Sequence, residues 1–156
     1  MKVQLLIVGK TQDKHLSALI DDYVERLSHY LSFSPVTINE LKNTKSMTHE
    51  QQKKEEGKLI LSYVDSSTFL ILLDEKGKEY RSMEFARQME KLTNIARPLC
   101  FVIGGPFGFS DEVYERADQL LSLSKMTFSH QMVRLIFVEQ LYRAMTILRG
   151  EQYHHE

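Results

Sequence analysis

Apolar runs and helical patterns alternate along the chain. Residues 2–9, 68–73 and 99–103 are runs rich in apolar and β-branched residues. Such runs are typical of strands that are buried on both faces of a parallel sheet. Residues 35–41 alternate between polar and apolar positions and predict a half-exposed strand, and residues 120–124 predict a short last strand.

The segments between these strands carry helix signals. Thr48 and Gln51 form a capping-box pattern, and Ser82 and Ser110 stand where an N-cap is needed. The helix that Thr48 opens has a thin apolar stripe, so we expect much of it to face water. Residues 74–77 predict a turn. Helices are expected over residues 13–31, 48–63, 83–93 and 131–149, with a short one from Asp111.

Strands that alternate with helices predict an α/β fold with a mainly parallel sheet and helices on both faces. The 156 residues contain no repeat and no linker-like stretch. We therefore expect a single domain over residues 1–156.

The run at 99–108, Leu-Cys-Phe-Val-Ile-Gly-Gly-Pro-Phe-Gly, ends a predicted strand in a glycine-rich corner. Gly104 and Gly105 have no side chains, so a ligand can approach their backbone closely. Asp74 and residues 123–128 follow two other predicted strands. Because the carboxyl ends of parallel strands meet at one edge, we expect these loops to form the active site. Their mixture of free backbone and apolar groups suits an adenine and a neutral ribose better than a triphosphate.

Several common site types are excluded. Gly9-Lys10-Thr11 lacks the upstream glycine of a phosphate-binding P-loop, and neither a G-x-G-x-x-G nor a G-x-S-x-G pattern is present. The six histidines show no zinc-binding spacing, so no metal is expected. The only cysteine, Cys100, lies within an apolar run, which favours a buried thiol in a reducing compartment.

The net charge of −1 limits how the protein can bind nucleic acid. A protein that binds through nonspecific electrostatics usually carries a basic excess. Binding to RNA would instead depend on local basic patches, on basic groups combined from two chains, or on a site whose shape fits the RNA. No stretch resembles a signal peptide or reaches the length of a membrane span, so we expect a cytoplasmic protein with no membrane partner.

One set of short motifs, taken in order, resembles the RlmH family of SPOUT-class methyltransferases, which modify N3 of a pseudouridine in bacterial 23S rRNA. The resemblance covers essentially the whole chain. The matching motifs are Leu-Leu-Asp at 72–74, Ile-Gly-Gly-Pro-x-Gly at 103–108, Leu-Ser-Leu-Ser at 121–124, His130, Val133-Arg134, the segment 138–144 and Tyr153-His154.

The resemblance implies a deep C-terminal trefoil knot, a homodimer whose sites are completed by the partner chain, and no separate RNA-binding domain. It also implies that the knot loops hold S-adenosylmethionine. The cofactor-binding residues would be Leu73, Gly104, Leu123, Ser124, Lys125, Met126, Thr127 and Phe128. The dimer would pool basic groups around the RNA, among them Lys10, Lys42, Lys45, Lys53 and Lys54.

The methyl acceptor must lose its N3 proton, so the site has to orient the base and assist deprotonation. We expect His154 or Glu139 to accept the proton, and Arg134 and Arg143 to grip a phosphate or a uracil carbonyl. Glu139 and Arg143 are also spaced for a simple helix ion pair, and Tyr142 would suit dimer packing. The residues expected to bind substrate are His130, Tyr142, Arg143 and Tyr153.

His155 stands where relatives often have Arg or Lys, which puts a phosphate contact there in doubt. Two other functions stay open: a SPOUT methyltransferase that acts on tRNA, and a protein that binds the cofactor or assists ribosome assembly without catalysis. With so little basic surface, we expect the substrate to be the assembled ribosome, which supplies a preformed shape.

Overall fold

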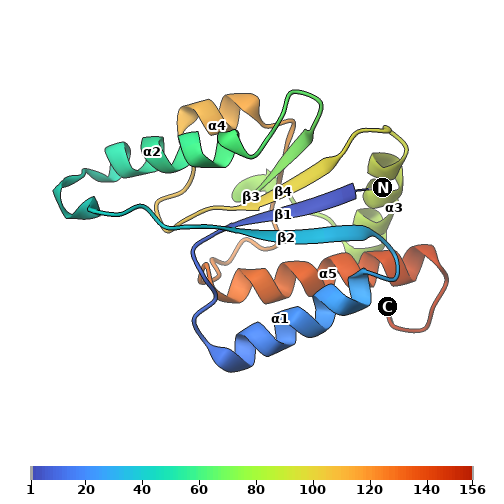
Figure 1. The fold of residues 1–156 in the computed structure, drawn as a ribbon. Helices are drawn as coiled ribbons and strands as arrows, with labels where there is room; N and C mark the ends of the chain where they lie inside the picture. The colour runs from blue at the N-terminus through green and yellow to red at the C-terminus, as the bar shows by residue number, and fades with distance from the viewer. Residues whose placement is uncertain (1, 156) are drawn as a thin grey trace.

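Five parallel strands form the centre of the molecule (Figure 1). The computed structural model describes residues 2–155. Met1 and Glu156, the ends of the predicted domain, lie outside the described residues. The sheet order is β2-β1-β4-β3-β5, and every neighbouring pair is parallel. The strands are β1 (Lys2–Val8), β2 (Ser32–Ile38), β3 (Phe69–Lys78), β4 (Leu99–Ile103) and β5 (Gln119–Leu121).

Helices cover both faces of the sheet, which confirms the predicted α/β class. One face carries α1 (Lys14–Leu27), α3 (Ser82–Thr93) and α5 (Met132–Leu148), and the other carries α2 (His49–Ser62) and α4 (Asp111–Arg116). A single 3₁₀ turn, η1 (Thr44–Ser46), lies between β2 and α2.

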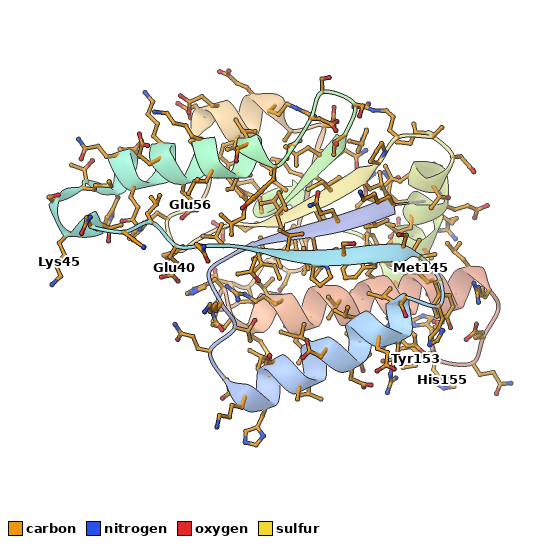
Figure 2. The ribbon with its side chains drawn as sticks, viewed as in Figure 1. Glu40, Lys45, Glu56, Met145, Tyr153 and His155 are labelled. Atoms are coloured by element: carbon orange, nitrogen blue, oxygen red, sulfur yellow. The ribbon has the colours of Figure 1, made fainter. Side chains whose placement is uncertain are left out.

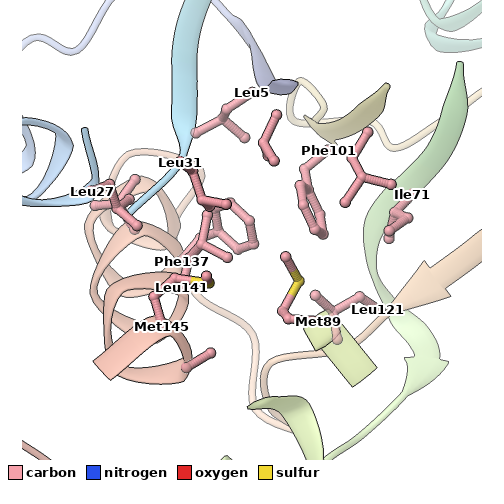
Figure 3. Close-up of a cluster of buried hydrophobic side chains, with 14 of the residues drawn as sticks. Leu5, Leu27, Leu31, Ile71, Met89, Phe101, Leu121, Phe137, Leu141 and Met145 are labelled. Carbon is pink, nitrogen blue, oxygen red and sulfur yellow. The ribbon is translucent and has the colours of Figure 1, made fainter. Parts of the chain in front are cut away.

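The central strands are apolar throughout because both of their faces are buried. In β1, Leu5 and Ile7 join the core under α1, α3 and α5, whereas Leu6 and Val8 join the core under α2 and α4. Figure 3 shows the larger core, in which the rings of Phe101 and Phe137 are 4.8 Å apart between centroids. The continuous apolar runs of the sequence therefore correspond to two cores separated by one sheet.

Some boundaries differ from the sequence prediction. The helix predicted over 13–31 ends at Leu27, and the strand predicted over 35–41 is β2, which begins at Ser32 and ends at Ile38. β2 lies at the edge of the sheet, where Pro35 is tolerated because its missing N–H costs no central ladder bond. Pairing with β1 sets the ends of β2, and this long-range contact is not visible in the local pattern.

Two predictions between β3 and α3 were wrong. The turn predicted at 74–77 lies within β3, since Leu73 and Lys78 both pair with Leu121 and the residues between them form an irregularity in the strand. Ser82 is the first helical residue of α3 rather than its N-cap, and the Glu84 side chain accepts a bond from the Arg81 N–H at 2.9 Å instead.

The N-caps predicted for α2 and α4 are both present. Thr48 Oγ1 accepts from the Gln51 N–H at 3.1 Å, and Gln51 Oε1 accepts from the Thr48 N–H at 2.9 Å, which completes the capping box of α2. Ser110 caps α4 by accepting from the Val113 N–H. These caps are local, so the sequence alone was sufficient to find them.

Cys100 is a buried strand thiol, as predicted: it is 0% exposed, and burial raises its pKa to about 12. We expect the native protein to resist alkylation by iodoacetamide at pH 8, because the reagent reacts with accessible thiolate. The protein unfolded in guanidinium should react within minutes. Mass spectrometry of both samples measures this, and rapid alkylation of the native protein would contradict it.

Candidate functional site

A cavity of about 710 Å³ opens at the carboxyl edge of the sheet, where β3, β4 and β5 end. Its size falls within the range of about 300–1,000 Å³ that is typical of small-molecule sites. It is lined by Lys53, Leu73, Asp74, Glu75, Lys76, residues 103–109, Asp111, Tyr114, residues 121–124, residues 126–130 and Val133. The three loops that the sequence singled out therefore form one site.

The glycine-rich corner after β4 forms one wall of the cavity. A Cβ atom at Gly104 would lie 2.8 Å from Cε1 of Phe109, so a side chain at that position would have to displace this buried ring. Gly104 and Gly105 both line the cavity, and because they have no side chains they present only backbone atoms to a ligand there, as the sequence predicted.

The structure brings most of the predicted cofactor-binding residues to this cavity. Seven of the eight line it, namely Leu73, Gly104, Leu123, Ser124, Met126, Thr127 and Phe128. Lys125 belongs to the same loop, but it is exposed and does not line the cavity. His130, predicted to bind substrate, lies on the cavity wall next to Ser129.

The cavity also holds Tyr114, a polar residue that the sequence did not point to, next to the predicted Asp74. Asp74 accepts a hydrogen bond from the Tyr114 hydroxyl and a second from the Lys76 N–H at 2.8 Å. Burial raises the pKa of Tyr114, and the bond to Asp74 acts in the same direction. Asp74 was part of the Leu-Leu-Asp motif, whereas Tyr114 lies on α4 and reaches the site only through packing that the sequence does not show.

The charges of the lining favour a cation over an anion. Asp74, Glu75 and Asp111 contribute carboxylates, against the ammonium groups of Lys53 and Lys76. Lys53 is moreover paired with Glu50 at 2.9 Å. A triphosphate would therefore meet net repulsion, while a positively charged ligand would not.

Arg134 is held inside the protein and is only 1% exposed. Its guanidinium donates to the carbonyl oxygens of Val8 at 2.9 Å and Gly9 at 3.0 Å, to Oγ1 of Thr11 at 3.0 Å, and to the carbonyl of His130 at 3.0 Å. Burial lowers its pKa. The side chain thereby fixes the end of β1 to the start of α5, and its predicted grip on a phosphate or carbonyl stays a prediction.

The remaining predicted residues form a second cluster around the middle of α5 and the C-terminal tail. Arg143 donates to Oε1 of Glu139 from Nη2 at 2.6 Å and from Nε at 3.0 Å. Its Nη1 is 3.1 Å from Nδ1 of His154. Tyr153 donates to the same Glu139 oxygen at 3.4 Å, and its hydroxyl is 3.0 Å from that of Tyr23.

Burial and the contacts within this cluster raise the pKa of Tyr153 and determine the tautomer of His154. Because Arg143 is only a donor, Nδ1 of His154 must accept, which leaves the proton of the neutral ring on Nε2. Burial raises the pKa of Tyr153, helped by its bond to Tyr23 and by the charge of Glu139. Tyr142 packs edge-to-face on Tyr153 at 4.8 Å and also contacts Tyr23 and Tyr30. In one chain, Tyr142 is thus part of the packing between α1, α5 and the tail.

The cavity lies at the start of α5, whereas the cluster lies around the middle of this helix and the C-terminal tail. Val133 lines the cavity and Arg143 follows ten residues later, which corresponds to about 15 Å along a helix axis. Figure 2 shows Tyr153 and His155 at the opposite end of the molecule from Glu40 and Glu56, which lie near the carboxyl edge. A single chain therefore does not bring Glu139, Arg143, Tyr153 and His154 to the cavity.

Among residues 2–155, no helix combines the length and apolar character needed to span a membrane. Within the same residues, no three His, Cys, Asp or Glu side chains gather in a way that would hold a metal ion.

A ligand-sized cavity at the carboxyl edge of a parallel sheet defines the class of α/β proteins that bind a small cofactor there. The family described as "Predicted SPOUT methyltransferase" matches residues 1–154. Proteins named ribosomal RNA large subunit methyltransferase H are similar over the full length of both chains, with 58% identity in Bacteroides fragilis and 56% in Phocaeicola vulgatus. A protein of that name from Christiangramia forsetii is 56% identical over 99% of both chains.

The chain belongs to the SPOUT methyltransferase family, in the branch of ribosomal RNA large subunit methyltransferase H. The family predicted from short motifs is thereby confirmed, and with it the assignment as an rRNA methyltransferase. The trefoil knot is implied by the same membership.

We expect Arg134→Ala to destabilise the protein by about 3 kcal/mol or more, because it leaves a cavity and removes the donors from the carbonyls of Val8 and Gly9. Arg143→Ala, on the same helix but partly exposed, should cost only about 1 kcal/mol. Urea unfolding of the two variants measures the difference. Equal, small losses would show that the buried contacts of Arg134 are not structural.

Proposed function

We propose that this protein transfers a methyl group from S-adenosylmethionine to N3 of a pseudouridine in 23S rRNA. It acts as a single domain in a cytoplasmic homodimer, and its substrate is the assembled ribosome. The observation that carries the proposal is the convergence of residues 73, 104, 123, 124 and 126–128 on one cavity of about 710 Å³ in a chain of this family.

The cavity fits S-adenosylmethionine in size and in charge. Gly104 and Gly105 leave room for a ligand against the backbone, and Leu73, Leu123 and Phe128 supply apolar contacts for an adenine. The carboxylates of Asp74 and Glu75 suit a ligand that carries a positive sulfonium and an ammonium group. When bound, the cofactor supplies an electrophilic methyl group. Lys125 would contribute through its backbone, since its side chain is exposed.

The acceptor nitrogen becomes nucleophilic only after it loses a proton. Oε1 of Glu139 already accepts from Arg143 and Tyr153, whereas Oε2 accepts one bond, from Gln140 at 3.1 Å. We assign proton acceptance to Oε2 of Glu139, with His154 as the alternative. His130, on the cavity wall, would orient the base beside the methyl group.

A homodimer would bring these two half-sites together. The cavity lies at the start of α5, with Glu139 about 9 Å and Arg143 about 15 Å further along the same helix. A partner chain that presents its own cluster to this cavity would complete the site. Met126 and Met132, which are 78% and 45% exposed beside the cavity loops, are apolar groups that association would cover.

The assembled ribosome is the substrate that the charge distribution favours. The chain has a net charge of −1, so little affinity would come from nonspecific attraction to RNA. Lys45 and Lys53 nevertheless lie at the cavity end of the molecule, Lys45 at its tip (Figure 2). Local basic groups and the preformed shape of a ribosome would then position the base.

We expect labelled methyl to pass from S-adenosylmethionine to 23S rRNA in intact ribosomes and not to protein-free 23S rRNA or tRNA. Gly104→Arg serves as the control, because its side chain would displace the ring of Phe109 in the cavity wall and misplace the cofactor, and it should reduce incorporation by at least about a hundredfold. Scintillation counting of the separated RNAs measures the result. Circular dichroism verifies that the control is folded.

The other outcomes separate the alternatives. Label in tRNA alone would assign the chain to a tRNA-modifying branch. Equal label in protein-free 23S rRNA would refute the preference for the assembled ribosome. Cofactor binding without any label would leave a binding or assembly protein and remove the catalytic roles of the α5 cluster.

A mixing experiment tests whether each site is shared between two chains. Gly104→Arg disrupts the cavity and leaves the cluster intact, whereas Arg143→Ala disrupts the cluster and leaves the cavity intact. If each site takes its cavity from one chain and its cluster from the partner, equal mixing with exchange of subunits restores about a quarter of the wild-type sites. Methyl transfer by the mixture measures this fraction.

The matched control is each inactive variant mixed with itself, which should stay inactive. If cavity and cluster serve the same chain, no dimer in the mixture contains an intact site. Activity that stays at the level of the separate variants, after verified subunit exchange, would therefore overturn the shared site.

A further inference from the structure

Glu56 is a buried carboxyl group that the proposed reaction does not use. It lies on α2 and is 7% exposed. Its Oε1 accepts a hydrogen bond from the backbone N–H of Gly105 at 3.0 Å. Removing a carboxylate from water costs free energy unless hydrogen bonds compensate. The burial of Glu56 therefore suggests that this side chain has a specific role.

The contact depends on the absence of a side chain at residue 105. A Cβ atom there would lie 2.6 Å from Oε2 of Glu56 and 2.9 Å from Oε1. A glycine thus lets the carboxylate reach the backbone, and the carboxylate in turn holds a backbone N–H that belongs to the cavity wall. The two residues are 49 positions apart in the sequence, so local patterns could not reveal the pair.

The next residue of α2 holds the other end of the same loop. A Cβ atom at Gly57 would lie 2.3 Å from Oγ of Ser110 and 3.1 Å from Cγ2 of Val113. Ser110 is the N-cap of α4. Residues 56 and 57 therefore contact both the beginning and the end of the glycine-rich loop, one by a hydrogen bond and the other by close packing.

The set of buried residues in α2 agrees with contact to this loop. Only Glu56, Gly57 and Ile60 are buried in this helix, in line with the thin apolar stripe of its sequence. A helix that served the core alone would bury a broad apolar face. Two of the three buried residues of α2 instead contact the loop over residues 105–110.

A second carboxylate connects this contact to Arg134. Burial raises the pKa of Glu56, and the charge of Glu40 acts in the same direction, while the Gly105 N–H opposes both. Burial lowers the pKa of Arg134, and Glu40 opposes that change. Glu40 thus interacts with Glu56 and with Arg134, and Figure 2 shows Glu40 and Glu56 at the same end of the molecule.

We propose that Glu56 is a positioning residue for the proposed methyl transfer: by accepting from the Gly105 N–H, it holds the glycine-rich loop in the conformation that receives the cofactor. The inference rests on the proposed function, because the cavity must bind S-adenosylmethionine for the loop conformation to matter. Glu56 itself touches neither cofactor nor substrate, since it does not line the cavity.

The test compares variants that differ in their ability to accept this bond. Glu56→Gln keeps an oxygen at the same position, Glu56→Asp is one methylene too short to reach Gly105, and Glu56→Leu removes the acceptor. Glu55→Leu, at a partly exposed position of the same helix, is the matched control. Titration calorimetry with S-adenosylmethionine and amide hydrogen exchange of residues 104–108 without cofactor are measured for all four variants.

We expect Glu56→Leu and Glu56→Asp to weaken cofactor binding by at least about tenfold and to speed exchange of the Gly105 amide. Glu56→Gln and Glu55→Leu should stay within about threefold of the wild type. In methyl transfer the loss should appear as a higher KM for the cofactor, with kcat preserved at saturation, because the bound cofactor would itself hold the loop in the same conformation.

Each outcome decides a separate question. If the wild type fails to bind S-adenosylmethionine, the proposed function fails, and amide exchange still reports whether Glu56 orders the loop. If the wild type binds and Glu56→Asp binds equally well with unchanged exchange, the positioning role is overturned. A tenfold loss in Glu56→Gln would also overturn it, since the acceptor is present. Should Glu56→Leu fail to fold, the comparison of the Asp and Gln variants decides.

Discussion

Parallel pairing of the central strands is the constraint on which the rest of this structure depends. Because β3, β4 and β5 run in the same direction, their carboxyl ends meet at one edge and bring together loops that are far apart in the sequence. Two buried groups then fix that edge from inside. Arg134 holds the end of β1 to α5, and Glu56 holds the corner after β4 to α2. The cavity is therefore built on the sheet and maintained by polar contacts behind it.

The sequence was sufficient to predict the elements that depend on neighbouring residues or on a regular apolar pattern. Continuous apolar runs located the central strands, and short-range caps located the starts of α2 and α4. It failed where a distant partner decides: β3 continues through residues 74–77 because Lys78 pairs with Leu121, although the local residues are typical of a turn. The loops of the site were predictable from strand ends, whereas Tyr114 and Glu56 were not, because their contacts bridge 40 and 49 positions.

The two groups of predicted site residues differ in how they are assembled. The cavity forms within one chain, since most of its residues follow neighbouring strands and the others come from α2, α4 and α5. The polar side chains around Glu139 and Arg143 form hydrogen bonds with one another. They lie further along α5, next to the aromatic rings of Tyr23 and Tyr142. Helix α5 therefore holds the cavity and the cluster at a fixed spacing. That spacing is the structural reason for our proposal that each site combines the cavity of one chain with the cluster of another.

The position of the only thiol has a practical consequence. Since Cys100 is buried in the core under α2 and α4, the folded chain is in effect free of cysteine for surface labelling. A cysteine introduced at an exposed position, such as Lys45 near the cavity or Gln152 in the tail, would be the one site that a maleimide probe modifies. Pairs of spin labels or fluorophores could thus report distances between the two chains of the proposed dimer without any change to the interior.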